Sequence, residues 1–255
     1  MRTLFVVADV HGFYDELIKA LDEQGFDKNN KDHIFVSCGD LLDRGTQPKE
    51  CLRFVNSLPN KILIRGNHED LLQEAIYRGS FLSHDYHNGT ADTVERITDI
   101  KLDNNPFMDF LALHQTMQED RDWNTYFHSC IDYYETEDYV FVHGWLPIDK
   151  TNFVPEYLPE WRDYDSDWAE ARWLNGINMW HNGIVEPNKT IVCGHWHSSY
   201  GNSVFHNKGR EFEKDINGKL LSDHTPFIDD GIIALDSCAA YSGFINCIRL
   251  EVEDE

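Results

Sequence analysis

The sequence is poor in positive charge and in long apolar segments. Lysine and arginine number 22 against 45 aspartates and glutamates, which gives a formal net charge of -23. Because binding along a nucleic-acid backbone needs many cationic side chains to displace counterions, we do not expect it here. No apolar run approaches the length that crosses a bilayer, and the first residues lead into a strand-like pattern instead of a signal peptide. We therefore expect a cytoplasmic protein that does not contact the membrane.

The sequence also lacks any pairing pattern among its cysteines. The six are scattered without a Cys-x-x-Cys pair, several within apolar runs: Cys38, Cys51, Cys130, Cys193, Cys238 and Cys247. This distribution favours buried free thiols over a disulfide framework or a structural cysteine zinc site. Internal repeats and low-complexity linkers are absent as well. A chain of 255 residues can bury the core of one full α/β domain.

Short apolar runs alternate with helix-like patterns in the first third of the chain. Continuous apolar runs at 4–7, 34–36 and 62–64 are each followed by apolar residues at helical spacing, the second of these helices starting near Pro48. Such strand–loop–helix units typically build a parallel sheet. Further strand-like runs stand at 139–142, 191–193, 232–235 and 244–252. We predict a single domain over 1–255 with a polar, mainly helical cap insertion at about 79–137.

Five of the apolar runs end in loops beside glycine that carry side chains able to bind a metal ion. These side chains are Asp9 with His11, Asp40, Asn67, His143, and His195 with His197. Buried aspartate, asparagine and histidine all need partners, so five such loops at strand ends are hard to explain by packing alone. Carboxylate, imidazole and amide oxygen suit manganese, iron, zinc or magnesium. The set exceeds the needs of one ion and therefore predicts two, bridged by Asp40.

Four of these motifs resemble the signature of PPP-type Ser/Thr phosphatases, a group within the calcineurin-like metallophosphoesterases. The motifs are Asp9-Val10-His11-Gly12, Gly39-Asp40-Leu41-Leu42-Asp43-Arg44-Gly45, Gly66-Asn67-His68-Glu69 and His143-Gly144. Gly194-His195 and Leu235-Asp236-Ser237-Cys238 are most similar to the bacterial branch, which includes protein phosphatases and diadenosine tetraphosphate hydrolases. The resemblance implies an α/β (α+β, four-layer) fold, in which a two-sheet β-sandwich is flanked by helices. It also implies two divalent metal ions, with manganese preferred and iron, zinc or magnesium as alternatives.

The resemblance also implies a role for each motif residue. The implied metal ligands are Asp9 and His11 for the first ion, Asp40 as the bridge, and Asn67, His143 and His195 for the second. His68 would donate a proton to the leaving oxygen, Asp43 would orient His68, and Arg44 would bind the phosphate. Glu69 is expected to support the loops and not to bind metal.

The chain departs from the family pattern at several positions. Trp145 replaces the second glycine of His-Gly-Gly, which predicts an aromatic side chain beside the substrate. His197 forms a Gly-His-x-His end, and metal ligation and substrate contact are equally open for it. A second phosphate-binding arginine is expected at Arg172, with Arg162 as the next choice, and Arg65 could also reach the phosphate or brace its loop. The tryptophan-rich segment 147–188 predicts a rim that packs the fold or offers a platform to a purine or a peptide.

Together these residues predict a metal-dependent hydrolase of phosphomonoesters, in which a metal-bridging hydroxide attacks phosphorus in line. The simplest substrate is phosphoserine or phosphothreonine in a protein, with small phosphoesters also accepted. The alternatives are a diadenosine polyphosphate hydrolase, favoured if the tryptophans stack adenine, and a metal-binding relative without catalysis. Intact His68, Asp43 and Arg44 argue against the last, because a scaffold needs neither an acid nor a phosphate-binding fork. The sequence leaves the oligomeric state open.

Overall fold

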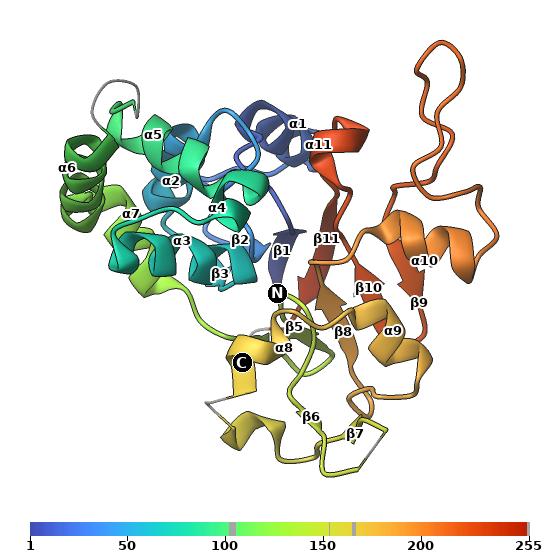
Figure 1. Ribbon diagram of the computed structural model, residues 1–255. Helices are drawn as coiled ribbons and strands as arrows, with labels where there is room; N and C mark the ends of the chain where they lie inside the picture. Colours follow the sequence, from blue (N-terminus) through green and yellow to red (C-terminus); the bar gives the residue numbers. More distant parts are fainter. Residues whose placement is uncertain (102–105, 153, 165–166, 254–255) are drawn as a thin grey trace.

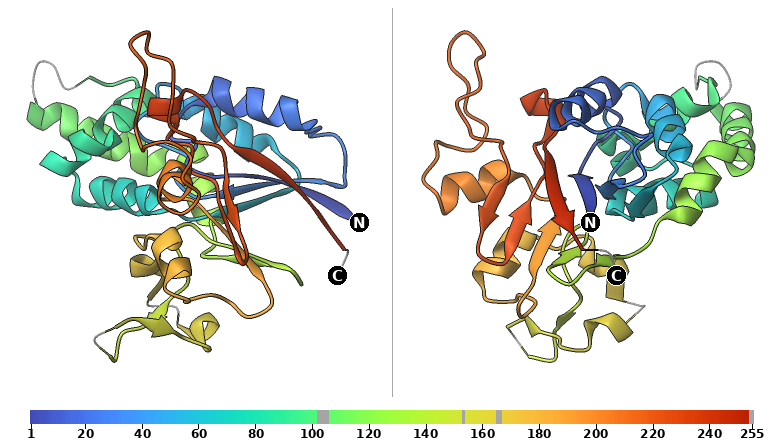
Figure 2. Two further views of the ribbon diagram at one scale, coloured as in Figure 1. Left: turned by 90° about the vertical axis from the view of Figure 1, so that its right-hand side faces the viewer. Right: turned by 180° about the vertical axis from the view of Figure 1, so that it is seen from behind.

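Two β-sheets face each other at the centre of the molecule, with helices on their outer sides (Figure 1; Figure 2). The structure is a computed structural model that describes residues 1–101, 106–152, 154–164 and 167–253. The first sheet has the strand order β11-β1-β2-β3. Its strands are β1 (Arg2–Val7), β2 (His33–Cys38), β3 (Lys61–Ile64) and β11 (Cys247–Val252). Strands β1, β2 and β3 are parallel, and β11 closes the edge antiparallel to β1.

The second sheet has the strand order β4-β5-β8-β10-β9. Its strands are β4 (Tyr134–Glu135), β5 (Tyr139–Phe141), β8 (Thr190–Cys193), β9 (Phe227–Asp229) and β10 (Ile232–Ala234). Strands β5, β8 and β10 are parallel to one another, and both edge strands are antiparallel to their neighbours. A separate pair, β6 (Ile148–Asp149) with β7 (Glu156–Tyr157), lies in the tryptophan-rich segment. The carboxyl ends of the parallel strands of both sheets therefore lie at a common edge.

Three helices follow the parallel strands of the first sheet where the apolar spacing predicts them. They are α1 (Tyr14–Gln24), α2 (Pro48–Ser57) and α3 (Asn67–Arg78). Helix α2 begins with Pro48 in its first turn, where the missing N–H costs nothing. Helix α1 ends at Gly25, whose left-handed φ of 78° allows its amide to close the last turn.

The described part of 79–137 is mainly helical. It contains α4 (Ser83–Asn88), α5 (Thr90–Thr98), α6 (Pro106–Glu119) and α7 (Arg121–Ser129). These helices pack against α2 and α3 on the outer face of the first sheet. Val94, Ile97, Trp123 and Tyr126 are buried in the same hydrophobic cluster as the helices of the first sheet. The insertion is thus part of the main core and not a separate lid.

The outer face of the second sheet carries shorter helices. They are the 3-10 turn η1 (Trp161–Asp163), α8 (Trp168–Ala171), α9 (Gly176–His181) and α10 (Ser198–Val204). Helix α11 (Ala239–Ser242) lies near the first sheet instead. The chain from 206 to 226 includes an arm that projects from the body between α10 and β9, with a bridge between Lys214 and Leu220, whereas Ser222 and His224 near its end are buried (Figure 1). None of the described helices is long and apolar enough to span a membrane.

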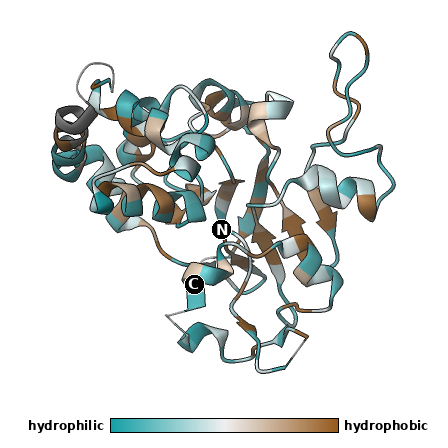
Figure 3. Cartoon of the chain, in the orientation of Figure 1, coloured by the Kyte–Doolittle hydropathy of each residue, from teal (hydrophilic) through white to brown (hydrophobic). Residues whose placement is uncertain are grey.

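Three hydrophobic clusters fill the spaces between the four layers. Along β1, Phe5 and Val7 face the helices while Leu4 and Val6 face the second sheet, as the period of two in a strand dictates. Figure 3 shows the apolar residues concentrated on the central strands, with hydrophilic residues on loops and outer faces. Each fully buried side chain of this kind contributes about 1.5–3 kcal/mol relative to exposure. The predicted α/β two-sheet sandwich is confirmed, and all six cysteines are free thiols.

Candidate metal centre

The predicted ligand residues meet where the parallel strands of both sheets end. Asp9 and His11 follow β1, Asp40 follows β2, Asn67 follows β3, His143 follows β5, and His195 follows β8. All of these side chains except His195 have an exposed fraction of at most 3%. Residues that are distant in sequence are therefore brought together by strand topology alone.

The loops reach this common point through strained backbone. Asp9, His11, Asp40 and His195 have φ angles of 52°, 49°, 53° and 65°, in the left-handed region that side chains other than glycine rarely adopt. Each such residue costs on the order of 1–3 kcal/mol and persists only where its surroundings hold it. The sharp turns direct the side chains inward directly after the strands end.

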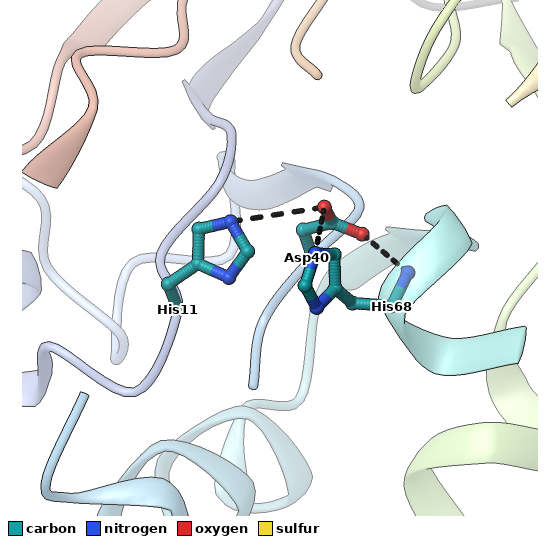
Figure 4. A group of neighbouring side chains, drawn as sticks. All are labelled: His11, Asp40 and His68. Atoms are coloured by element: carbon teal, nitrogen blue, oxygen red, sulfur yellow. Dashed lines mark hydrogen bonds and ion pairs between the residues drawn. The ribbon is translucent and has the colours of Figure 1, made fainter. Parts of the chain in front are cut away.

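The first group of possible ligands surrounds Asp40 from the first sheet (Figure 4). His11 Nε2 lies 3.7 Å from Asp40 Oδ2, and His68 Nε2 lies 3.9 Å from the same oxygen. Asp9 Oδ1 is 3.9 Å from His11 Nε2. The other ring nitrogen of His11 lies 2.9 Å from the carbonyl oxygen of Leu42, which fixes the ring and leaves Nε2 directed at the carboxylates.

The second group joins Asp40 to ligands from the second sheet. His143 Nε2 is 3.4 Å from Asp40 Oδ2, and His195 completes the group. Asn67 Oδ1 lies 2.8 Å from His143 Nε2 and 3.0 Å from His195 Nδ1. Asp40 is the member that both groups share, which is the position that a bridging carboxylate needs.

The electrostatics of the cluster fit divalent cations. Burial raises the pKa of Asp9 well above its usual range, and repulsion from Asp236 raises it further. Burial also opposes ionisation of Asp40, but His143 and His68 hold its pKa well below its usual range. Two cations among these buried carboxylates would relieve their mutual repulsion. The mixture of carboxylate, imidazole and amide oxygen suits manganese, iron, zinc or magnesium.

The two histidines from the second sheet have opposite pKa shifts. Burial alone would lower the pKa of His143, but the adjacent Asp40 carboxylate raises it to about 10. Burial lowers the pKa of His195 to about 3, and the nearby His143 lowers it further. Burial therefore keeps His195 neutral, with its lone pair available to a metal.

Asp43 and Arg44 lie beside His68, a member of the first group. His68 Nδ1 is 2.8 Å from Asp43 Oδ2, and Arg44 Nη2 is 3.2 Å from His68 Nε2. The same Oδ2 of Asp43 accepts a hydrogen bond of 2.7 Å from the hydroxyl of Thr90. Arg44 is exposed, so its guanidinium can meet an incoming anion. These contacts are compatible with the expected roles of acid, orienting carboxylate and phosphate-binding residue, which stay predictions.

Glu69 fastens two of the loops, as the sequence predicts. Its carboxylate accepts hydrogen bonds from the backbone amides of Asp40, Leu41 and Gly66 at 2.8–3.0 Å. The hydroxyl of Tyr126, from helix α7, donates a further bond of 2.9 Å. Glu69 is 1% exposed, so these bonds are protected from water and hold the Asp40 loop against the start of α3.

Two glycines allow backbone to approach the carboxylates closely. A Cβ at Gly66 would collide with the side chain and amide nitrogen of Asp40, and a Cβ at Gly194 would collide with the carboxylate of Asp9. Any other residue would displace a carboxylate from the cluster. Steric constraints therefore explain why glycine stands at these two positions beside the motifs.

A family profile described as Calcineurin-like phosphoesterase matches residues 2–226. The chain belongs to the calcineurin-like phosphoesterase family. The family has divalent metal ions at its centre, in agreement with the donor set described above. The finer assignment to PPP-type Ser/Thr phosphatases does not follow from this match.

Curated relatives of this calcineurin-like phosphoesterase match part of the chain. "Bis(5'-nucleosyl)-tetraphosphatase, symmetrical" of Psychromonas ingrahamii is 46% identical over 76 residues, which are 29% of this chain and 26% of the relative. The protein of the same name from Erwinia tasmaniensis is 36% identical over 97 residues, which are 38% of this chain and 31% of the relative. The matched segments thus span less than a third of the length of either relative.

Two solved structures share the calcineurin-like fold over nearly the whole chain. A putative diadenosine tetraphosphatase aligns with a TM-score of 0.51 and 16% identity, covering 100% of this chain and 95% of that one. A mutant of a cold-active protein tyrosine phosphatase aligns with a TM-score of 0.53 and 16% identity, covering 98% of this chain and 76% of that one. At this identity, the similarities establish the fold and not the reaction.

Several residues of this phosphoesterase do not lie where sequence reasoning places them. Trp145 has no exposed surface, packs in the core of the second sheet, and donates its indole N–H to the carbonyl oxygen of Ile184. The prediction that it contacts substrate is therefore wrong. The indole fits there because Gly176 has no side chain; a Cβ at this position would overlap the ring.

The predicted phosphate-binding role of Arg172 is also wrong in this structure. Its Nη1 lies 2.7 Å from Asp70 and its Nη2 lies 2.5 Å from Asp132, so two carboxylates already occupy the guanidinium. Arg65 is 3.8 Å from Asp70 and lies over the ring of Phe127, which supports its bracing alternative.

Arg162, the second choice for phosphate binding, pairs with Glu135 and Glu186 instead. These contacts tie the tryptophan-rich segment to the second sheet. Arg44 is thus the predicted phosphate-binding arginine that the structure places beside the ligand groups.

His197 and Asp236 border the centre on the side of the second sheet. His197 Nδ1 lies 2.9 Å from Glu211 on the projecting arm, and within the described chain His197 belongs to neither ligand group. Asp236 follows β10, is 3% exposed, and acts electrostatically on Asp9. Sequence reasoning assigned it no site role, although the apolar run that ends in Asp236 repeats the pattern of the other loops. Thr90 and Tyr126, in contrast, do not follow an apolar run, and no sequence pattern marks them as part of the site.

Proposed function

We propose that the chain hydrolyses dinucleoside polyphosphates of the diadenosine tetraphosphate type at this metal centre. The observation that supports phosphoester hydrolysis is the placement of Arg44 and the His68–Asp43 pair beside an Asp40 carboxylate common to two ligand groups. This combination provides charge for a phosphoryl group and a proton for its leaving oxygen. The names of the curated relatives favour a dinucleoside tetraphosphate as the substrate over a phosphoprotein.

The first ion would be held by Asp9, His11 and Asp40, and the second by Asp40, Asn67, His143 and His195. Such ions withdraw charge from phosphate oxygens and lower the pKa of water enough to supply a nucleophile near neutral pH. His197 remains a candidate for either metal or substrate contact. Its Nδ1 contacts Glu211, and its ring lies beside Trp196, next to His195.

The protein side chains would bind the phosphate and supply the proton for the leaving oxygen. Arg44 can pair its planar fork with two non-bridging phosphate oxygens. His68 would hold the proton that the leaving oxygen takes up, and Asp43 would stabilise the charged form of His68 through their 2.8 Å contact. Thr90 would keep the Asp43 carboxylate turned toward His68 through its own bond to the same oxygen.

Phosphoprotein hydrolysis is the second candidate, and the His68–Asp43 pair favours it. A serine or threonine alkoxide is a strong base that needs a proton to leave, whereas a nucleotide phosphate leaves more easily. A protonating histidine is therefore of greater value to a phosphomonoesterase.

A substrate comparison tests the two candidates. We would measure kcat/KM for diadenosine tetraphosphate and for a phosphoserine peptide in the presence of manganese, iron, zinc or magnesium. We expect diadenosine tetraphosphate to be preferred at least about tenfold and to yield ADP as the main product. A preference for the peptide would support the phosphatase instead. Failure to cleave either substrate with every metal would indicate a metal-binding relative without catalysis.

A further inference from the structure

Two exposed tryptophans stand beside the candidate metal centre. Four of the seven tryptophans have exposed fractions of at most 2%: Trp123, Trp145, Trp161 and Trp168. Trp173 and Trp196 are instead 50% and 37% exposed. An indole combines a large apolar face with one polar group, which makes an exposed pair of this kind well suited to cover a flat ligand.

Both exposed rings contact the same ligand residue. The ring centroid of Trp173 is 5.9 Å from that of His195, with an interplanar angle of 83°. The ring centroid of Trp196 is 6.2 Å from His195, with an angle of 57°. The rings come from different segments, one after α8 and one after β8. The two indoles, which come from different segments, thus both adjoin His195.

Trp173 is fixed through its backbone and its neighbour. Its amide donates to the carbonyl oxygen of Glu170 at 2.9 Å. The preceding residue, Arg172, is locked by its pairs with Asp70 and Asp132. Arg172 therefore anchors the segment that presents the indole and does not itself meet the phosphate.

Trp196 is fixed by the tight turn at His195. The amide of Trp196 donates to the carbonyl oxygen of Gly194 at 2.7 Å, across the left-handed His195. Its ring also contacts His197 at 6.1 Å and Tyr200 at 6.3 Å. An aromatic surface held in this way loses little conformational entropy when a ligand stacks on it.

We propose that Trp173 and Trp196 form a nucleobase subsite, in which a purine of the substrate stacks beside His195 while its phosphates lie near Asp40 and Arg44. The inference rests on the proposed function and names the part of the substrate that this side of the centre recognises. Stacking uses the π-face that every base presents and needs no cationic side chain, which suits a chain with a net charge of -23.

Binding of ADP and of pyrophosphate separates base recognition from phosphate recognition. We would titrate each ligand into the manganese-loaded chain by calorimetry, using wild type, Trp173→Ala and Trp196→Ala. We expect each substitution to weaken ADP binding about tenfold and to change pyrophosphate binding less than about twofold. Trp173→Phe and Trp196→Phe should restore part of the loss, because a phenyl ring still stacks. Tyr77→Ala, at an aromatic residue of α3 that is 83% exposed, is the control and should leave both affinities unchanged.

Two results would overturn the subsite: equal ADP affinity in wild type and both alanine variants, or no preference of wild type for ADP over pyrophosphate. Circular dichroism of each variant verifies that it is folded. The proposed function is judged separately by turnover. If wild type cleaves a phosphoserine peptide but not diadenosine tetraphosphate, the proposed function fails, and the ADP titration still decides the subsite.

Discussion

The two sheets contribute unequal halves to the metal centre. On the side of the first sheet, Glu69 binds three backbone amides and Tyr126, and Thr90 binds Asp43, all in buried positions. On the side of the second sheet, two exposed indoles contact His195, and His197 bonds to Glu211 on a projecting arm. The hydrogen bonds on the first side are buried, whereas on the second side His143 is buried and the aromatic residues around His195 are exposed.

This difference suggests that the first half serves mainly the chemistry and that the exposed part of the second half serves substrate recognition. Groups that transfer protons or bind metal must be held to within a fraction of an ångström, and buried hydrogen bonds provide that rigidity. Groups that recognise the rest of a substrate must remain accessible to it. We therefore expect substitutions in the first half to alter turnover and stability, and substitutions in the second half to alter substrate preference.

Asp40 joins the two halves, so its replacement should have the largest effect. Asp40→Asn keeps the shape of the side chain but removes the charge that both ligand groups share. Loss of several kcal/mol of charge stabilisation should reduce kcat about 10³-fold or more, with less than two manganese ions retained per chain. Steady-state kinetics and elemental analysis check this. A variant with two ions and unchanged kcat would contradict the bridging role.

His68 belongs to the first half and tests its chemistry. His68→Asn should lower turnover of a phosphoserine peptide by roughly 10²–10⁴-fold, because the alkoxide then leaves without a proton. The loss should be smaller on diadenosine tetraphosphate, whose leaving group is a weaker base. The matched control is His128→Asn at an exposed histidine of α7, which should behave as wild type. Equal losses on both substrates would argue against proton donation by His68.

Glu69 tests whether buried hydrogen bonds hold the first half together. Glu69→Gln places an amide N–H against backbone amides that need an acceptor, so we expect a loss of about 2–4 kcal/mol in the free energy of unfolding. Tyr126→Phe removes one partner of Glu69 and should cost about 1–2 kcal/mol. Urea denaturation measures both. If Glu69→Gln is no less stable than wild type, the loops are held by other contacts.

Glu135 tests the exposed ion pairs of the second half, where the smallest effect is expected. The hydrogen bond from Arg162 lowers the pKa of Glu135 from 4.5 to about 2. Because the folded-state pKa is depressed, the stabilisation is present above pH 4.5 and is lost as the pH falls toward 2. Glu135→Gln should therefore cost less than about 1 kcal/mol at pH 7, since the pair is partly exposed to solvent and screened by it. The difference from wild type, measured by urea denaturation, should shrink between pH 5 and pH 3; a constant difference would assign it to packing.

The fold and the meeting of the candidate ligands at one edge were predictable because both rest on short stretches of sequence. Each strand, its glycine and its ligand lie within a few residues, as in the segment from Val36 to Asp40, and parallel strands bring such ends to one edge. The helix that begins at Pro48 follows equally local rules.

Residues whose partners are distant in sequence were not predictable. Arg172 binds Asp70 and Asp132, which lie 102 and 40 residues away. Trp145 turns into the core because Gly176 leaves room for its ring. Thr90 reaches Asp43 only because the helical insertion packs on the first sheet.

The sequence by itself determined the strand–loop order, the set of possible ligands and the glycines that let the loops approach one another. The tertiary structure alone decided which arginine faces the centre, which tryptophans remain exposed beside His195, and which hydroxyls hold the catalytic loops. The reason is physical: backbone conformation and side-chain chemistry are local, whereas the direction of a long side chain depends on the space and charges that distant segments place around it.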